Sequence, residues 1–170
     1  LQVSPAGPIT IAGGKWTTYR KMAEDTIDQT IDVGDLSQRP CQTEDLHLHG
    51  FHPNAQRFDD LAIYGSDAPD VRALIDSNER YAEKLHPERP TRAGEVIWAA
   101  RREMARTVED FLSRRTRTLL LNARISLEMA EPVAALLAEE LGRNKDWQQR
   151  QMKEFSELAS GYVPDKSSDL

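Results

Sequence analysis

The chain has 170 residues and a formal net charge of -6, and an acidic balance of this kind disfavours a general nucleic-acid binder. The single cysteine, Cys41, excludes an intrachain disulfide bond and a cysteine-based metal cluster. No apolar run approaches the roughly 18 residues that a membrane-spanning helix needs.

Residues 1–32 form the first predicted unit. β-branched residues on both sides of a turn with proline and glycine predict a strand pair at its start. Apolar residues then recur at helical spacing over residues 19–31, with Thr17 or Thr18 as the N-cap and Gly34 at the end of the helix. Because the strands have no evident sheet to join, we expect this chain to be the C-terminal piece of a larger protein.

A glycine turn, Gly13-Gly14, lies between the predicted strand and the predicted helix and is followed by Lys15. A helix that begins after such a turn offers unpaired backbone N–H groups and the positive end of its dipole. This arrangement suits an anion or a developing negative charge, to which Lys15 adds a full positive charge. An ordinary turn before an ordinary helix is the alternative, and the short motif taken alone favours that alternative.

The rest of the chain is predicted to be helical after a linker. Proline and glycine interrupt every periodic pattern in residues 33–54, so this segment is predicted to be the linker. Residues 55–163 are predicted to form a compact helical domain, and residues 164–170 a polar tail. The predicted fold class is therefore mainly α, with a strand–turn–helix segment in front of a helical domain.

Several local features of the helical part are specific enough to test. The apolar spacing predicts helices over residues 58–64, 66–75, 91–104, 107–121, 124–141 and 145–160. Thr107 and Asp110 have the spacing of a capping box, and Pro132 is predicted to divide its segment, with a new helix near Glu131. Four aromatic residues are predicted to lie in the core: Trp98, Phe111, Trp147 and Phe155.

Two clusters of charged or titratable residues allow more than one interpretation. His47, His49 and His52 could be drawn as a metal site, but their alternation with apolar residues favours an extended segment without metal, and His86 is expected at the surface. A set of arginines suggests a phosphate or nucleic-acid surface, a docking face, or solvated and locally paired side chains: Arg101, Arg102, Arg106, Arg114, Arg115, Arg117 and Arg124. We favour the structural interpretations, because the overall charge opposes nucleic acid.

Three blocks of sequence carry a resemblance to a known family. They are AGGKWTTYRKMAEDTID over residues 12–28, REMARTVEDFLSRRTR over residues 102–117, and LLAEELG over residues 136–142. In this order, and over nearly the whole chain, they resemble the C-terminal part of FAD-dependent glycerol-3-phosphate dehydrogenases. A GGK motif alone is weak, whereas GGKWTTYR followed by MAEDTID, with the second block at a fitting distance, is specific.

The resemblance implies a larger flavoprotein oxidoreductase of glycerol metabolism. Such an enzyme has a Rossmann-type FAD domain, a substrate domain and a helical C-terminal cap, and it passes hydride from glycerol 3-phosphate to FAD. Electrons then go to a quinone, or to oxygen in the oxidase variants. This chain contains no G-x-G-x-x-G motif, so residues 1–32 would complete the FAD domain and residues 55–163 would form the cap. The isolated fragment is therefore expected to be inactive.

By the same resemblance, the cofactor-binding residues expected in this chain are Gly13, Gly14, Lys15, Trp16 and Thr17. Backbone N–H groups and Lys15 would stabilise negative charge on the reduced flavin. We expect no catalytic residue and no metal ligand in the fragment.

The expected partners are the rest of the parent chain, glycerol 3-phosphate and a quinone, but no nucleic acid. A homodimer through the open strand edge is a further expectation. We expect a cytoplasmic location, with the parent peripheral to the cytoplasmic membrane. The rival interpretation is a non-catalytic helical module for interaction or dimerisation.

Overall fold

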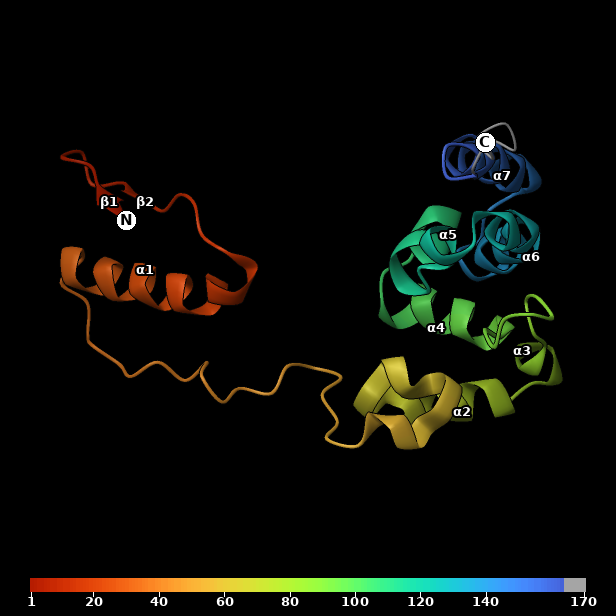
Figure 1. Cartoon of the computed structure of the whole chain (residues 1–170), viewed down its shortest axis with the longest axis horizontal. Helices are drawn as coiled ribbons and strands as arrows, with labels where there is room; N and C mark the ends of the chain where they lie inside the picture. Colours follow the sequence, from red (N-terminus) through yellow and green to blue (C-terminus); the bar gives the residue numbers. More distant parts are fainter. Residues whose placement is uncertain (164–170) are drawn as a thin grey trace, which may run out of the picture. The chain divides into compact units, whose positions relative to one another are not determined.

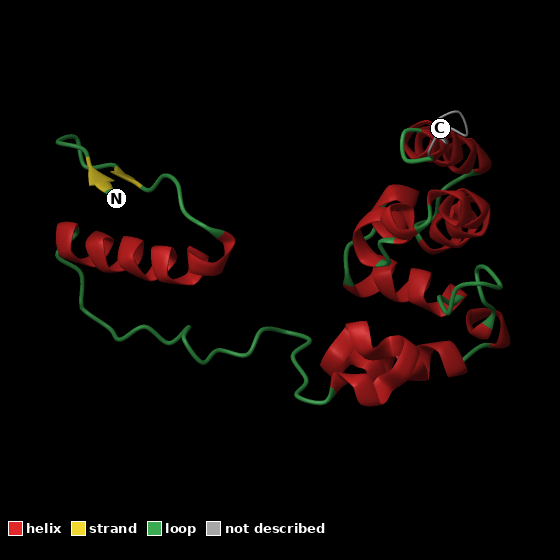
Figure 2. Ribbon diagram, in the orientation of Figure 1, coloured by secondary structure: helices red, strands yellow, loops and turns green. Residues whose placement is uncertain are grey.

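The computed structural model describes residues 1–163 and divides the chain into two compact units, residues 1–49 and residues 50 onward (Figure 1). No helix or strand lies between Val33 and Ala55. The structure is mainly α-helical, as predicted, and its strands are confined to the start of the first unit (Figure 2). Within residues 1–163, no helix is both long enough and apolar enough to span a membrane. The tail predicted for residues 164–170 lies outside the described residues.

The first unit opens with the predicted strand pair. Strands β1 (Gln2–Val3) and β2 (Ile9–Thr10) pair antiparallel, with Val3 opposite Ile9. The connecting turn contains Gly7 at φ +100°, a conformation that glycine adopts without steric cost. Both strands are short and largely exposed, so this hairpin has little core of its own.

Helix α1 (Tyr19–Val33) follows the strand pair and ends at Gly34, as predicted. Thr18 is the N-cap residue of α1, one of the two predicted, but its side chain makes no capping hydrogen bond to α1. A 3₁₀ turn over Trp16–Thr18 precedes α1, and the Thr18 hydroxyl accepts a hydrogen bond from the Lys15 amide at 3.2 Å. The same hydroxyl donates to the Lys15 carbonyl at 3.1 Å, so it closes the 3₁₀ turn instead of capping α1.

The second unit is a bundle of helices. Its elements are a 3₁₀ segment (Ala55–Asp67), α2 (Ala68–Asp76), α3 (Glu79–Ala82), α4 (Ala93–Arg102), a π-helical turn (Asp110–Arg115), α5 (Thr118–Leu121), α6 (Ala123–Glu140) and α7 (Lys145–Ser160). Helix α6 packs against α4, α5 and α7, and α2 packs against α4 (Figure 1). The predicted bounds of the last helix are confirmed.

The core of the second unit confirms most of the aromatic predictions. Phe111, Phe155 and Trp98 are buried, while Trp147 is partly exposed and packs against the main cluster. That cluster joins α4, α6 and α7, and a smaller one joins the 3₁₀ segment, α2 and Trp98. Burial of this apolar surface is the main force that holds the helices together.

The predicted helix over residues 58–64 is instead a 3₁₀ segment with backbone breaks at Asp59 and Gly65. Gly65 has φ +52°, and a Cβ there would lie 1.7 Å from the Gly50 carbonyl oxygen. That carbonyl accepts a hydrogen bond from the Ser66 amide at 3.1 Å. The close approach requires glycine at position 65 and replaces a regular helical turn with a kink.

The predicted division of the helix at Pro132 is wrong. Helix α6 runs unbroken through Pro132, with the Asn122 side chain as its N-cap, accepting from the Ile125 amide at 3.1 Å. Proline removes one helical hydrogen bond and usually kinks or ends a helix. Here Met129 and Val133 on either side of it are fully buried. Packing of both halves into the core outweighs the local cost.

Candidate functional site

The residues predicted to bind the cofactor lie along an open groove in the first unit, with a volume of about 590 Å³. Gly13, Gly14, Lys15 and Trp16 line the groove together with side chains from α1. Thr17 does not contribute to the lining. The local chain therefore brings four of the five predicted residues to one surface.

The two glycines have conformations that only glycine adopts easily. Gly13 has φ +79° and Gly14 has φ +115°. A Cβ at Gly14 would lie 2.2 Å from the sulfur of Met22 on α1. The Met22 side chain is flexible and could move, so the backbone conformation, at φ +115°, is what favours glycine at position 14.

The backbone amide of Lys15 is hydrogen-bonded, whereas its ammonium group has no partner among the described residues. Its amide donates to Thr18, so this N–H is not available to an anion, contrary to the expectation for the helix start. Within residues 1–163, its ammonium group makes no hydrogen bond or ion pair. By contrast, Lys21 of α1 pairs with Glu24 and Asp25, both at 3.0 Å.

The groove also exposes a large apolar surface. Trp16 is 87% exposed in this chain, and its ring lies 5.4 Å from that of Tyr19 with a tilt of 32°. Tyr19 and Ile27 are exposed as well, and α1 has no buried residue. Exposed aromatic and apolar side chains and Lys15 thus lie on the same open groove.

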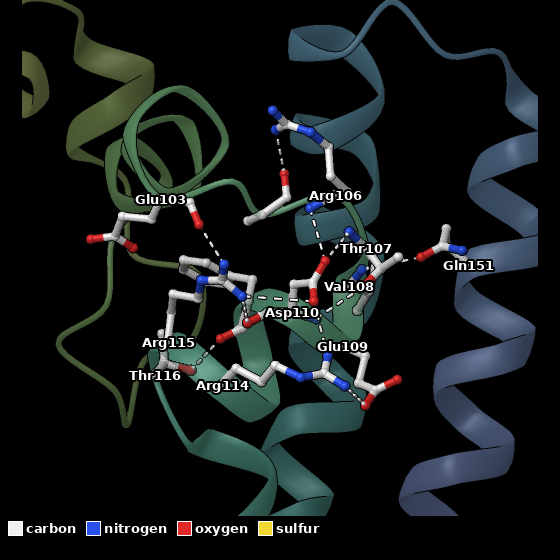
Figure 3. Close-up of polar contacts among 12 residues, drawn as sticks. Glu103, Arg106, Thr107, Val108, Glu109, Asp110, Arg114, Arg115, Thr116 and Gln151 are labelled. Atoms are coloured by element: carbon white, nitrogen blue, oxygen red, sulfur yellow. Dashed lines mark hydrogen bonds and ion pairs between the residues drawn. The ribbon is translucent and has the colours of Figure 1, made fainter. Parts of the chain in front are cut away.

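In the second unit, the predicted capping box is confirmed (Figure 3). The Asp110 carboxylate accepts from the Thr107 amide at 3.0 Å, and the Thr107 hydroxyl accepts from the Asp110 amide at 3.0 Å. A second amide, that of Arg106, donates to the same carboxylate at 2.9 Å. Burial disfavours the ionised form of Asp110, but these hydrogen bonds outweigh it and lower its pKa.

Two of the arginines donate hydrogen bonds to backbone carbonyls at and just after the C-terminal end of α4. Arg106 donates to the carbonyls of Ala100 and Ala105 at 2.8 and 2.9 Å. Arg115 donates to the carbonyl of Glu103 and to that of Asp110 (Figure 3). Carbonyls at the end of a helix lack intrahelical partners, so the two guanidinium groups satisfy acceptors that would otherwise be left unpaired.

Two further arginines make ion pairs. Arg101 forms a bidentate pair with Glu140 at 2.7 and 2.8 Å, which links α4 to α6. Arg114 pairs with Glu109 at 2.6 Å and with Asp110 at 2.9 Å. Through their side chains, the remaining three members of the set make no hydrogen bond or ion pair with the described residues: Arg102, Arg117 and Arg124.

A buried polar pair in the second unit was not predicted. The Tyr64 hydroxyl donates to the Glu95 carboxylate at 2.9 Å, and the Arg92 amide donates to the same carboxylate at 2.7 Å. Burial raises the pKa of Glu95. The first of these bonds spans 31 positions, so only the Arg92–Glu95 spacing of a helix start offered a local signal.

The histidines do not form a metal site in the described part of the chain, where no group of three or more suitable ligands occurs. His52 accepts from the Asn54 amide at 3.0 Å and packs its ring edge-on against Phe58. His86, which we expected at the surface, is partly exposed: its side chain is 13% exposed and contacts Glu128 of α6 at 2.9 Å.

Residues from both units match the model of one protein family. The model of the C-terminal domain of alpha-glycerophosphate oxidase matches residues 8–151, which include the groove and the arginine-rich segment. The chain belongs to this family.

Several individual relatives match nearly the whole chain. The mitochondrial glycerol-3-phosphate dehydrogenase of Mesocricetus auratus is 34% identical over 96% of this chain, and the probable mitochondrial enzyme of Caenorhabditis elegans is 34% identical over 90%. The mitochondrial enzyme of Schizosaccharomyces pombe is 28% identical over 94%. The chain spans 24% of the length of the first two relatives and 30% of the third. No solved structure matches.

These relatives correct one expectation from the sequence. We expected a cytoplasmic location, whereas the relatives are named as mitochondrial glycerol-3-phosphate dehydrogenases. The expectation rested on the lack of a spanning segment and of paired cysteines, and neither property distinguishes one reducing compartment from another.

Proposed function

We propose that this chain is the C-terminal region of a flavoprotein that oxidises sn-glycerol 3-phosphate to dihydroxyacetone phosphate. In this proposal hydride passes to FAD, and the electrons then pass to a quinone. Residues 1–32 complete the FAD domain, residues 33–54 link it onward, and residues 55–163 form the helical cap. The fragment alone is inactive, because the remaining FAD-binding residues and the catalytic base belong to the preceding part of the parent.

The observation that carries this proposal is the family match together with the character of the groove. The groove combines a glycine turn that permits close approach, an unpaired lysine and exposed aromatic rings. These are groups that suit one edge of a flavin ring. Gly13, Gly14, Lys15 and Trp16 would contact the flavin, and Thr17 would contribute through its backbone at the start of the helical turn.

When bound, the flavin accepts a hydride and gains negative charge near N1 and its C2 carbonyl. Lys15 supplies a fixed positive charge that favours this change, and the glycines allow the backbone to lie close to the ring. Trp16 and Tyr19 exclude water from the adjoining surface, which strengthens the attraction between charges.

Flavin reduction by glycerol 3-phosphate in the parent protein tests the proposed function directly. We expect bleaching of the flavin spectrum on addition of substrate, and loss of that reduction when this chain is deleted. Reduction followed by consumption of a soluble quinone, without hydrogen peroxide, would support quinone as the acceptor. An intact parent with neither bound flavin nor reduction would overturn the proposal.

The role of Lys15 is tested by Lys15→Met in the parent. Removing the positive charge should lower the flavin potential and slow its reduction by substrate. Lys21→Met is the matched control, because Lys21 is an exposed lysine six residues further on, already paired with Glu24 and Asp25. If the two variants have the same potential and reduction rate as the parent, Lys15 does not have the assigned role.

A further inference from the structure

A second cavity, of about 450 Å³, opens at the surface of the second unit and is lined by none of the residues assigned to the flavin. Its lining combines cationic, acidic and apolar side chains: Ile63, Tyr64, Glu103, Arg114, Arg115, Thr116 and Arg117. We call this surface the arginine face. Three arginines and one carboxylate line the cavity, and two of the arginines are already paired: Arg114 with Glu109 and Asp110, and Arg115 with Asp110 at 3.7 Å.

Apolar side chains are exposed around the arginine face. In the described part of the second unit, four large apolar residues are more than 60% exposed: Ile63 at 70%, Met104 at 75%, Leu120 at 63% and Leu121 at 67%. Ile63 lines the cavity, Met104 follows Glu103, and both leucine amides donate to the Arg117 carbonyl. Large exposed apolar side chains that follow lining residues in sequence or bond to their backbone are candidates for an interaction surface.

The backbone at the arginine face is held in unusual conformations. Met104 has φ +58° and Arg117 has φ +55°, both in the left-handed region that side chains other than glycine, asparagine and aspartate rarely adopt. The sequence had placed Met104 inside a helix, but α4 ends at Arg102, and the Ala105 amide turns back to the Ala99 carbonyl at 3.0 Å. Left-handed backbone directs Met104 outward, and a π-helical turn (Asp110–Arg115) adjoins the cavity as well. Both features cluster at functional sites in proteins.

Arg117 is the arginine at this face that is available to a partner. Arg114 already pairs with Glu109 and Asp110, and Arg115 is held by two backbone carbonyls. The Arg117 side chain is exposed and makes no ion pair or hydrogen bond with residues 1–163. An incoming carboxylate could therefore bind its guanidinium in the bidentate manner without displacing an existing contact.

We infer that the arginine face is the surface on which the preceding part of the parent protein packs. That part presents an acidic side chain to Arg117 and apolar side chains to Ile63, Met104, Leu120 and Leu121. This inference rests on the proposed function, because it takes the parent to be a larger enzyme. Interfaces are enriched in arginine and methionine around an apolar centre, which is the composition found here.

Other occupants fit the observations less well. A symmetric pair of these chains would bring together two copies of the same lining, in which three arginines and one carboxylate, Glu103, could face one another. Nucleic acid would gain little from four exposed apolar side chains, and the chain's net charge opposes it. The relatives are about four times as long as the match, so a polypeptide large enough to cover the face exists in proteins of this kind.

Oxidation of Met104 by hydrogen peroxide tests the inference, because a methionine must be exposed to be oxidised readily. The rate for Met104 is measured by mass spectrometry in the 170-residue chain and in the intact parent. Met129, which is fully buried, serves as the internal control for folding. We expect Met104 to be oxidised rapidly in the isolated chain and to slow towards the rate of Met129 in the parent. Equal rates for Met104 in the two proteins would overturn the inference.

The experiment also separates the alternatives. If Met104 in the isolated chain becomes slower to oxidise as the chain concentration rises, a second copy of the chain covers the face, and the inference is overturned. If Met104 of the parent is protected only when anionic phospholipid vesicles are present, a lipid surface covers the face, and the inference is likewise overturned. The readout requires neither bound flavin nor activity, so a failure here is distinct from the failure of glycerol 3-phosphate to reduce the flavin.

A charge reversal tests the role of Arg117. In the parent, Arg117→Glu should restore rapid oxidation of Met104 while Met129 stays slow. Arg143→Glu is the matched control, since Arg143 is also exposed and without a side-chain partner among the described residues, but lies in the connection between α6 and α7. Protection of Met104 that survives Arg117→Glu would contradict the proposed contact.

Discussion

Removing the Asp110 carboxylate should lower the free energy of unfolding substantially, although this side chain is not fully buried. The carboxylate is 22% exposed and accepts from the amides of Arg106 and Thr107 at 2.9 and 3.0 Å. Hydrogen bonds to a charged group contribute about 1.5–3 kcal/mol each. Taking the lower value for both, because the group is partly solvated, Asp110→Ala should cost about 3 kcal/mol. The exposed pair with Arg114 adds about 0.5 kcal/mol or less.

Urea unfolding of the chain, followed by circular dichroism, measures this cost. Asp110→Asn should lose about half as much, since its amide oxygen still accepts but carries no charge. Glu109→Ala is the matched control, because among the described residues the Glu109 side chain pairs with Arg114 alone, at 2.6 Å, and is 42% exposed. If Asp110→Ala destabilised the chain no more than Glu109→Ala, the capping box would not have the importance that we assign to it.

The lowered pKa of Asp110 predicts that the stability of the chain depends on pH. Burial opposes the ionisation of Asp110, but hydrogen bonds from Arg106 and Thr107 outweigh it, so its pKa is lower in the folded chain. A depressed pKa contributes stability that is present above the unfolded value, about 3.9, and is lost as the pH falls through the folded value. The difference in unfolding free energy between the wild type and Asp110→Asn should therefore shrink as the pH falls below about 4. A difference that stays constant with pH would refute this assignment.

Two further substitutions test packing in the second unit by the same unfolding measurement. Tyr64→Phe removes the donor to the buried Glu95 carboxylate and should cost about 1–2 kcal/mol, and a neutral effect would show that this acceptor finds another partner. Gly94→Ala should destabilise by about 1–3 kcal/mol despite alanine's higher helix propensity, because its Cβ would lie 2.8 Å from a side-chain carbon of Ile75. Gly161→Ala is the control for this change, since the nearest atom would be 3.5 Å away, and equal effects of the two substitutions would contradict the packing argument.

The sequence by itself determined the features that depend on residues close together in the chain. The Thr107–Asp110 capping box, the strand pair and the helix ends at Gly34 and Gly161 were all predicted and confirmed. Each of them is decided by hydrogen bonds or backbone conformations within a few residues. The gathering of the glycine turn, Lys15 and Trp16 along one groove follows from the same local geometry.

Only the tertiary structure decided the features that join distant segments. The Arg101–Glu140 pair spans 39 positions and the Tyr64–Glu95 bond spans 31, and no local pattern selects one acceptor among many at such separations. Helix α6 continues through Pro132 because burial of its two halves outweighs a lost hydrogen bond. Met104 points outward because Ala105 turns back to cap α4. In each case desolvation and packing, which depend on the whole fold, overrode the preference of the local sequence.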